Sequence, residues 1–200
     1  MARSTREAAR TLAALAADQG GYFTAKQAKE AGYGYRHLDY HETAGNFERI
    51  EHGLYRLPTI PPAEHDELIR LSLWSRNQKD EPQAVVSHES ALVLHELGEF
   101  LPREIHLTVP PRFRKAAPKG VVLHKAALEP GDVEERAGFR VTTALKTLVD
   151  AAEGDVSLEQ LGKSVDEALA RGLVRRKKLE ETAREVERLS VVLGGTKSRR

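Results

Sequence analysis

Several features that would point to a particular chemistry are absent from this chain of 200 residues. It has no cysteine, which excludes disulfides, zinc thiolate sites and thiol catalysis. No run of about 18 apolar residues occurs, so no membrane span is expected. Neither a Walker-type phosphate loop nor a G-x-G-x-x-G stretch is present. The chain begins without an apolar signal segment, and we therefore expect a cytoplasmic protein.

The net charge of +1 conceals an uneven distribution along the chain. Lys and Arg number 8 against 7 Asp and Glu in residues 1–57, 13 against 19 in residues 58–170, and 10 against 4 in residues 171–200. Nucleic-acid-binding domains are often strongly basic as a whole. Because residues 1–57 are not, DNA binding by this segment has to depend on where its few charges lie.

Residues 1–57 follow the order helix, short strand, helix, tight turn, helix and hairpin. This order is typical of a winged helix-turn-helix, in which one helix enters a DNA groove. Capping-box patterns at residues 4–7 and 24–27 predict where the first two helices begin. A Gly-Tyr-Gly turn follows, and the third helix is expected over residues 35–44, anchored inward by Leu38.

The third helix is the expected reading element, because its first turns expose polar and aromatic side chains. Arg36 can make the bidentate contact to guanine that dominates direct readout. Basic residues of the second helix, and of the hairpin over residues 47–57, would contact phosphates or the minor groove. The predicted DNA-binding residues are Lys26, Lys29, Tyr35, Arg36, His37, Tyr40, Arg49, His52 and Arg56.

The remainder of the chain predicts a second domain, so that the whole is an α+β protein. Residues 58–62 contain three prolines and form a connector, residues 63–193 form a mixed α/β domain with a small sheet and several helices, and residues 194–200 form a disordered basic tail. Strands are expected at residues 84–86, 105–109, 121–124 and 139–141. Helices are expected at residues 63–76, 87–97, 142–152, 157–170 and 175–189.

The second domain offers only weak candidates for catalysis or metal binding. The adjacent pair Ser87 and His88 has the residue types of a nucleophile and a base, but a helix N-cap is the better interpretation of Ser87. Asp150 is expected to be a structural acid held by Arg140 or Lys146. The other histidines carry no carboxylate at ligand spacing, so neither a metal nor a cofactor is expected. These histidines are His95, His106 and His124.

The densest basic run of the chain lies near its C-terminal end. We interpret it as a surface for an acidic partner or nucleic acid, with a solvated helix start as the alternative. Cations are unfavourable at a helix N-terminus, which favours the partner surface. The predicted partner-binding residues are Arg171, Arg175, Arg176, Lys177 and Lys178.

Five segments follow one another in an order typical of a known family: residues 21–28, 50–57, 86–92, 106–110 and 141–150. Taken in order, these segments resemble the AbiEi family of antitoxins from type IV toxin–antitoxin systems. Lys146 stands where that family usually has Arg. The resemblance implies a non-enzymatic winged-helix repressor that binds inverted repeats in its own promoter, and a C-terminal domain that opposes a nucleotidyltransferase-like toxin.

Other functions remain open on the sequence alone. The winged helix can be a protein-contact module that never meets DNA, or a regulator without a toxin partner. An enzyme would need Asp132, Glu134 and Asp150 to meet a basic residue in a cleft. For the DNA-binding interpretation, we expect a monomer in solution or a dimer on DNA, since one short helix contacts too few bases for tight specificity.

Overall fold

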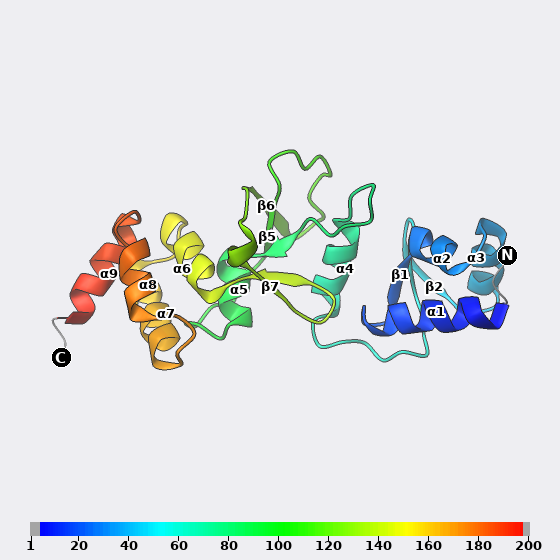
Figure 1. Cartoon of the computed structure of the whole chain (residues 1–200), viewed down its shortest axis with the longest axis horizontal. Coiled ribbons are helices and arrows are strands. Elements are labelled where there is room, and N and C mark those ends of the chain that lie inside the picture. Colours follow the sequence, from blue (N-terminus) through cyan, green and yellow to red (C-terminus); the bar gives the residue numbers. More distant parts are fainter. Residues whose placement is uncertain (1–4, 198–200) are drawn as a thin grey trace. The chain divides into compact units, whose positions relative to one another are not determined.

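The computed structural model in Figure 1 describes residues 5–197 and confirms an α+β protein with two small sheets. Contacts divide the chain into two compact units. The first, called the N-terminal unit, comprises the residues up to 83 together with 135–139. The second, called the C-terminal unit, comprises residues 84–134 and those from 140 onward.

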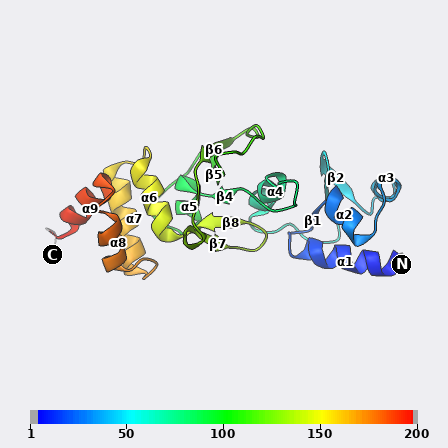
Figure 2. The same ribbon diagram turned by 45° about the horizontal axis from the view of Figure 1, so that its top comes forward.

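The N-terminal unit has the expected winged-helix order of elements, which Figure 2 shows from a second direction. Its sheet has the strand order β1-β3-β2, and both pairings are antiparallel. The elements are α1 (Thr5–Ala17), β1 (Tyr22–Thr24), α2 (Ala25–Ala31), α3 (Tyr35–Thr43), β2 (Glu48–Glu51), β3 (Leu54–Arg56) and α4 (Asp66–Trp74).

Local sequence signals account for the ends of the short helices. Thr24 caps α2, and its hydroxyl accepts a hydrogen bond from the backbone N–H of Gln27. The side-chain oxygen of Gln27 in turn accepts a hydrogen bond from the backbone N–H of Thr24. Gly32 ends α2 with a φ of 115°, a conformation that favours glycine. The capping box expected for α1 includes Ser4, which lies outside the described residues.

The core of the winged helix forms where α1, α2 and α3 meet the sheet. Leu12, Phe23 and Leu38 are almost completely buried in it. Leu38 is the anchor that the sequence predicted for the third helix. Tyr33, in the turn between α2 and α3, is also buried, and its ring packs edge-on against Phe47 with the centroids 5.5 Å apart. The turn is therefore held by an aromatic core contact as well as by its glycines.

Helix α4 packs with the winged helix in the same compact unit. Ile69 of α4 is buried, and the hydroxyl of Tyr22 on β1 donates a 2.5 Å hydrogen bond to Asp66. The compact unit is thus larger than the segment 1–57, because α4 supplies apolar and polar partners to β1. The division after residue 57 stays a prediction about which part folds and acts independently.

The C-terminal unit contains a five-stranded mixed sheet with the order β6-β5-β4-β8-β7. β4 pairs antiparallel with β5 and parallel with β8, while β5 and β6 are parallel. Its elements are β4 (Val85–Val86), α5 (His88–Leu94), β5 (Ile105–Val109), β6 (Val121–Lys125), η1 (Pro130–Asp132), β7 (Val133–Glu135), β8 (Arg140–Thr142), α6 (Ala144–Glu153), α7 (Leu158–Ala170), α8 (Arg176–Thr182) and α9 (Glu187–Lys197).

Helices α6 to α9 pack together around a core of leucines, and Figure 1 shows them as neighbouring helices. Leu148, Leu161, Leu179 and Leu189 are completely buried there. The helix expected over residues 175–189 is two helices, α8 and α9. Leu179 enters the core from α8, and Leu189 enters it from α9.

Two further features of the C-terminal unit differ from the expectation. The short strand β7 was not predicted. Helix α9 continues to Lys197, so it includes the backbone of residues 194–197, which were expected to belong to a disordered tail. Residues 198–200 lie outside the described part of the chain.

Candidate nucleic-acid interface

Helix α3 presents its polar side chains to solvent over its first two turns. Tyr35 and Tyr40 are 72% and 67% exposed, and Arg36 and His37 are exposed beside them. Leu38 is 2% exposed and fixes the opposite face of the helix in the core. A short helix held from one side, with aromatic and basic groups on the other, has the form required to enter a major groove.

The orientation of His37 is set by the turn that precedes α3. Its Nδ1 lies 3.4 Å from the backbone N–H of Gly34, which donates to it. In that tautomer the hydrogen of the imidazole is on Nε2. His37 therefore offers a hydrogen-bond donor at its exposed end, and guanine N7 and O6 are acceptors in the major groove.

Helix α2 adds two exposed lysines to this surface. The ammonium group of Lys29 lies 5.9 Å from the centroid of the Tyr35 ring, so the end of α2 and the start of α3 form one basic and aromatic patch. Lys26 is exposed and donates a 2.9 Å hydrogen bond to the carbonyl of Gln78. We call Lys26, Lys29, Tyr35, Arg36, His37 and Tyr40 the α2–α3 face.

The wing contributes fewer available charges than the sequence suggested. Arg49 and His52 are exposed, and Gly53 turns the hairpin with a φ of 75°. The side chain of Arg56 is only 12% exposed, and it donates to the carbonyl of Ile60 and forms a 4.0 Å ion pair with Glu48. Arg56 therefore holds the base of the wing to the connector, and its contact with DNA stays a prediction.

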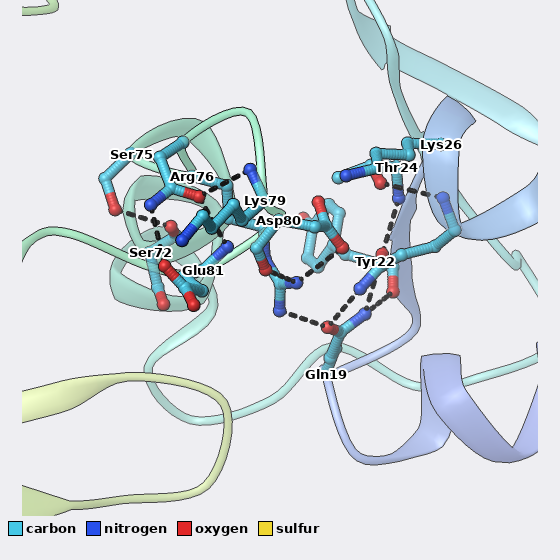
Figure 3. A network of polar contacts seen from close by, with 12 residues as sticks. Gln19, Tyr22, Thr24, Lys26, Ser72, Ser75, Arg76, Lys79, Asp80 and Glu81 are labelled. Atoms are coloured by element: carbon cyan, nitrogen blue, oxygen red, sulfur yellow. Dashed lines mark hydrogen bonds and ion pairs between the residues drawn. The ribbon is translucent and has the colours of Figure 1, made fainter. Parts of the chain in front are cut away.

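A polar network beneath α2 links it to the segment that follows α4 (Figure 3). The buried side-chain amides of Gln19 and Gln27 bond to each other, and Arg76 donates a 3.0 Å hydrogen bond to Gln19. Arg76 also pairs with Asp80 at 2.8 Å. Gln27 of the α2 capping box is thus linked through Gln19 to Arg76, which is distant in sequence. No local pattern in the sequence indicated this link.

Tyr22 belongs to the same part of the unit. Burial and the hydrogen bond to Asp66 raise the pKa of its phenol to about 12. The guanidinium of Arg56 lies 5.9 Å from the centroid of the Tyr22 ring. Tyr22 is therefore a structural donor that stays protonated at any ordinary pH.

The basic run after α7 is divided between structural and exposed side chains. Arg171 donates to the carbonyls of His95 and Glu96 at 2.7 and 2.9 Å, so it fastens α7 to the end of α5. Arg176 lies 3.9 Å from Glu180 in the same helix. The side chains of Arg175, Lys177 and Lys178 are exposed.

Of the carboxylates named by the enzymatic alternative, Asp150 is buried, while Asp132 and Glu134 are half-buried. Asp150 is 5% exposed and pairs with Lys146, as predicted, while its second oxygen is buried without a hydrogen-bond partner. Burial raises the pKa of Asp150, and the nearby charge of Asp132 raises it further. Asp150 is therefore a buried acid held by a half-buried Lys146, in keeping with the structural role expected of it.

Ser87 is the N-cap residue of α5, as predicted, but its side chain makes no capping hydrogen bond. It is completely buried, accepts a hydrogen bond from Thr108, and lies 2.9 Å from Nδ1 of His88. Thr108 and Ser87 bond across β5 and the start of α5, and this tertiary contact replaces the local capping hydrogen bond. A hydroxyl buried in this way cannot reach a substrate as a nucleophile.

Three of the histidines that the sequence left dispersed are brought together by the fold. His88, His106 and His124 come from α5, β5 and β6. Within residues 5–197, no group of three or more histidine or acidic side chains is arranged to hold a metal ion. In the same part of the chain, no helix is long and apolar enough to cross a bilayer.

Comparison with known proteins finds a similar family for part of the N-terminal region. Residues 10–58 match the family described as "Transcriptional regulator, AbiEi antitoxin". The resemblance to AbiEi antitoxins is therefore confirmed for the segment from α1 through the wing. The match spans α2 and α3 and so contains the whole α2–α3 face. No curated protein matches the chain.

The fold as a whole has a solved counterpart. The RV2827C protein from Mycobacterium tuberculosis, known from a crystal structure, is 19% identical, with a TM-score of 0.55 over 97% of this chain and 78% of that one. At this level of identity the likeness concerns the fold alone. It extends through both units, beyond the residues that the family model matches.

Proposed function

We propose that the protein is a DNA-binding transcriptional regulator of the antitoxin type, which binds inverted repeats in its own promoter and represses it. The observation that carries the proposal is the α2–α3 face, which lies within the segment matched by a family of transcriptional regulators. The face combines an arginine, a histidine and two tyrosines on one helix with lysines on its neighbour. These are the side chains that bind base edges and phosphates.

The charge of the segment does not argue against this function once the contacts are known. Arg36 and both lysines of the α2–α3 face are exposed. Glu48 pairs with Arg56, and Glu51 lies 3.6 Å from Arg70, so two acids of the wing are partly neutralised by cations of the same unit. Acidic side chains therefore oppose the positive groups that would contact a duplex less than the count of charges in residues 1–57 implies.

A second part of the proposal concerns the C-terminal unit. By its resemblance to AbiEi antitoxins, we assign to it the role of opposing a nucleotidyltransferase-like toxin, and this role needs no catalysis by the chain itself. The exposed side chains of Arg175, Lys177 and Lys178 supply a basic surface for an acidic partner. A regulator of this type acts in the cytoplasm, where its DNA ligand is.

The test is a binding titration of the full chain with a duplex from the region upstream of its gene, at fixed salt. We expect binding that a scrambled duplex of equal length does not compete, with two copies bound per inverted repeat. Equal binding to both duplexes would contradict promoter recognition. Absence of binding at low salt would instead support the protein-contact alternative, since phosphate contacts are strongest there.

The toxin role has a separate test. Co-expression of the chain with the nucleotidyltransferase-type gene next to its own should restore growth that the toxin alone arrests. A chain with Arg175, Lys177 and Lys178 replaced by Ala should restore growth less well if the basic surface binds the toxin. Full rescue by that variant would remove these residues from the partner surface.

A further inference from the structure

The three histidines of the C-terminal unit form a closely packed cluster with Glu89. The rings of His88 and His124 are stacked, with centroids 3.5 Å apart and planes 14° from parallel. Nδ1 of His106 lies 3.0 Å from Nε2 of His124 and 3.2 Å from a carboxylate oxygen of Glu89. We call these four residues the histidine cluster.

The cluster lies where the start of α5 is held against the sheet. The backbone N–H of Ser87 donates to the carbonyl of His106 at 3.0 Å, and the backbone N–H of His106 donates to the hydroxyl of Ser90 at 2.9 Å. His88 itself has a φ of 53°, a backbone conformation that is unfavourable for a residue with a side chain. The surrounding contacts therefore hold the first residue of α5 in a strained geometry.

The arrangement is suited to neutral imidazoles and not to charged ones. The short contact between His106 and His124 requires one nitrogen to donate and the other to accept, so it is lost when both rings are fully protonated. Two stacked imidazolium rings would place like charges at the 3.5 Å separation of His88 and His124. Glu89 lies beside His106 and can compensate one positive charge there.

The groups around His88 favour its neutral form. Burial, together with the neighbouring His124, His106 and Lys146, lowers the pKa of His88 to about 3. Burial and His106 also lower the pKa of His124, which Glu89 partly opposes. Lys146 comes from α6, which packs against α5, and its own partner is Asp150.

From this geometry we propose that the histidine cluster is a proton-responsive latch, which holds the start of α5 on β5 and β6 at neutral pH and releases it on acidification. In the unfolded chain each histidine takes up a proton below a pH of about 6.5. In the folded chain the pKa values of His88 and His124 are lowered, so these two rings take up a proton only at a lower pH. Acidification therefore favours states in which the cluster is open, and α5 is the element that the cluster fixes.

The ordinary pKa of histidine sets the size of the pH effect that His88 has on opening of the cluster. With an ordinary pKa of about 6.5 when released and no proton uptake when latched, the opening equilibrium shifts by about 30-fold between pH 7.5 and 5.0. A phenylalanine at this position keeps a planar ring for the stack but carries no proton. It should therefore remove this part of the pH dependence.

The experiment measures unfolding of the full chain at pH 7.5 and 5.0 for the unchanged protein, His88→Phe, His124→Phe and the control His52→Phe. His52 is exposed in the wing, so its replacement should leave the pH dependence unchanged. His88→Phe should reduce the acid-induced change in the unfolding equilibrium by about 30-fold relative to the control. An equal acid response of His88→Phe and His52→Phe would overturn the proposal.

A second measurement needs no variant and guards against a replacement that fails to fold. Hydrogen exchange, corrected for the intrinsic pH dependence of the amides, compares α5 with α7 in the unchanged chain. The latch predicts that protection in α5 falls between pH 7.5 and 5.0 by a larger factor than protection in α7. Protection that falls by the same factor in both helices would contradict it.

Discussion

The two basic surfaces of this molecule differ in how much of their charge is available to a partner. On the α2–α3 face, Arg36 and Lys29 are exposed, and Lys29 contacts the ring of Tyr35. In the run after α7, which is richer in charge, Arg171 holds two carbonyls and Arg176 lies near Glu180. The density of charge along a sequence therefore overestimates the charge that a surface presents, because intramolecular hydrogen bonds and ion pairs engage some of the basic side chains.

The largest expected effect concerns the anchor that makes the α2–α3 face possible. Leu38→Ala should lower the free energy of unfolding by about 2–5 kcal/mol, because it removes a buried side chain and leaves a cavity. Chemical denaturation measures this loss. The control Leu158→Ala, at a position 47% exposed, should change stability by less than about 0.5 kcal/mol. A loss of stability for Leu38→Ala as small as that expected for the control would show that α3 is not held from its inner face.

The next largest effect is on DNA affinity. Arg36→Ala should weaken binding to the promoter duplex by about 1–3 kcal/mol and relax the preference at one base position. Fluorescence anisotropy at fixed salt measures it. Arg112→Ala removes an exposed arginine from the C-terminal unit and should leave affinity unchanged. Equal affinity of the two variants would place DNA elsewhere on the molecule.

The contrast inside the C-terminal basic run gives a smaller effect on stability. Arg171→Ala should cost about 1 kcal/mol, because the carbonyls of His95 and Glu96 lose their donor. Arg175→Ala should change stability by less than about 0.5 kcal/mol, since its side chain is exposed. Thermal unfolding of the two variants distinguishes them. Were Arg175→Ala the more destabilising of the two, the division of the run into structural and exposed residues would fail.

The smallest effect is that of a phosphate contact. Lys29→Ala should weaken binding to all duplexes alike and lower the slope of affinity against salt by about 1. Titrations at several salt concentrations, with promoter and scrambled duplexes, measure both quantities. A loss confined to the promoter duplex would mean that Lys29 contacts a base.

The sequence predicted those parts of the fold that local signals determine. Thr24 with Gln27, Gly32 at the end of α2, and Leu38 on the inner face of α3 are where the patterns placed them. Each depends on neighbours within about one helical turn. The order of elements in the winged helix followed from these signals.

What the sequence could not predict depends on residues distant along the chain. The sequence suggested that Arg56 is an unpaired cation of the wing, but it donates a hydrogen bond to the carbonyl of Ile60 and forms an ion pair with Glu48. Ser87 had the pattern of a cap, but its hydroxyl bonds to Thr108 and lies against His88. Contacts of this kind are set by tertiary packing, and no spacing along the chain encodes them.

The histidine cluster shows the same limit in a different form. His88, His106 and His124 are separated by 18 residues in each case, and no helical or strand period connects them. They meet because β5 and β6 pair in parallel and α5 begins beside β5. A topological arrangement, not a motif, brings them together.

Methylation interference at guanine N7 shows whether α3 enters the major groove with Arg36 on a guanine. N7 faces the major groove and is one of the two acceptors that a bidentate arginine uses. We expect methylation of one guanine in each half-site to block binding of the unchanged protein, and Arg36→Ala to lose this sensitivity. Interference that is the same for both proteins, or that appears only with minor-groove modification, would show that Arg36 does not contact a guanine in the major groove.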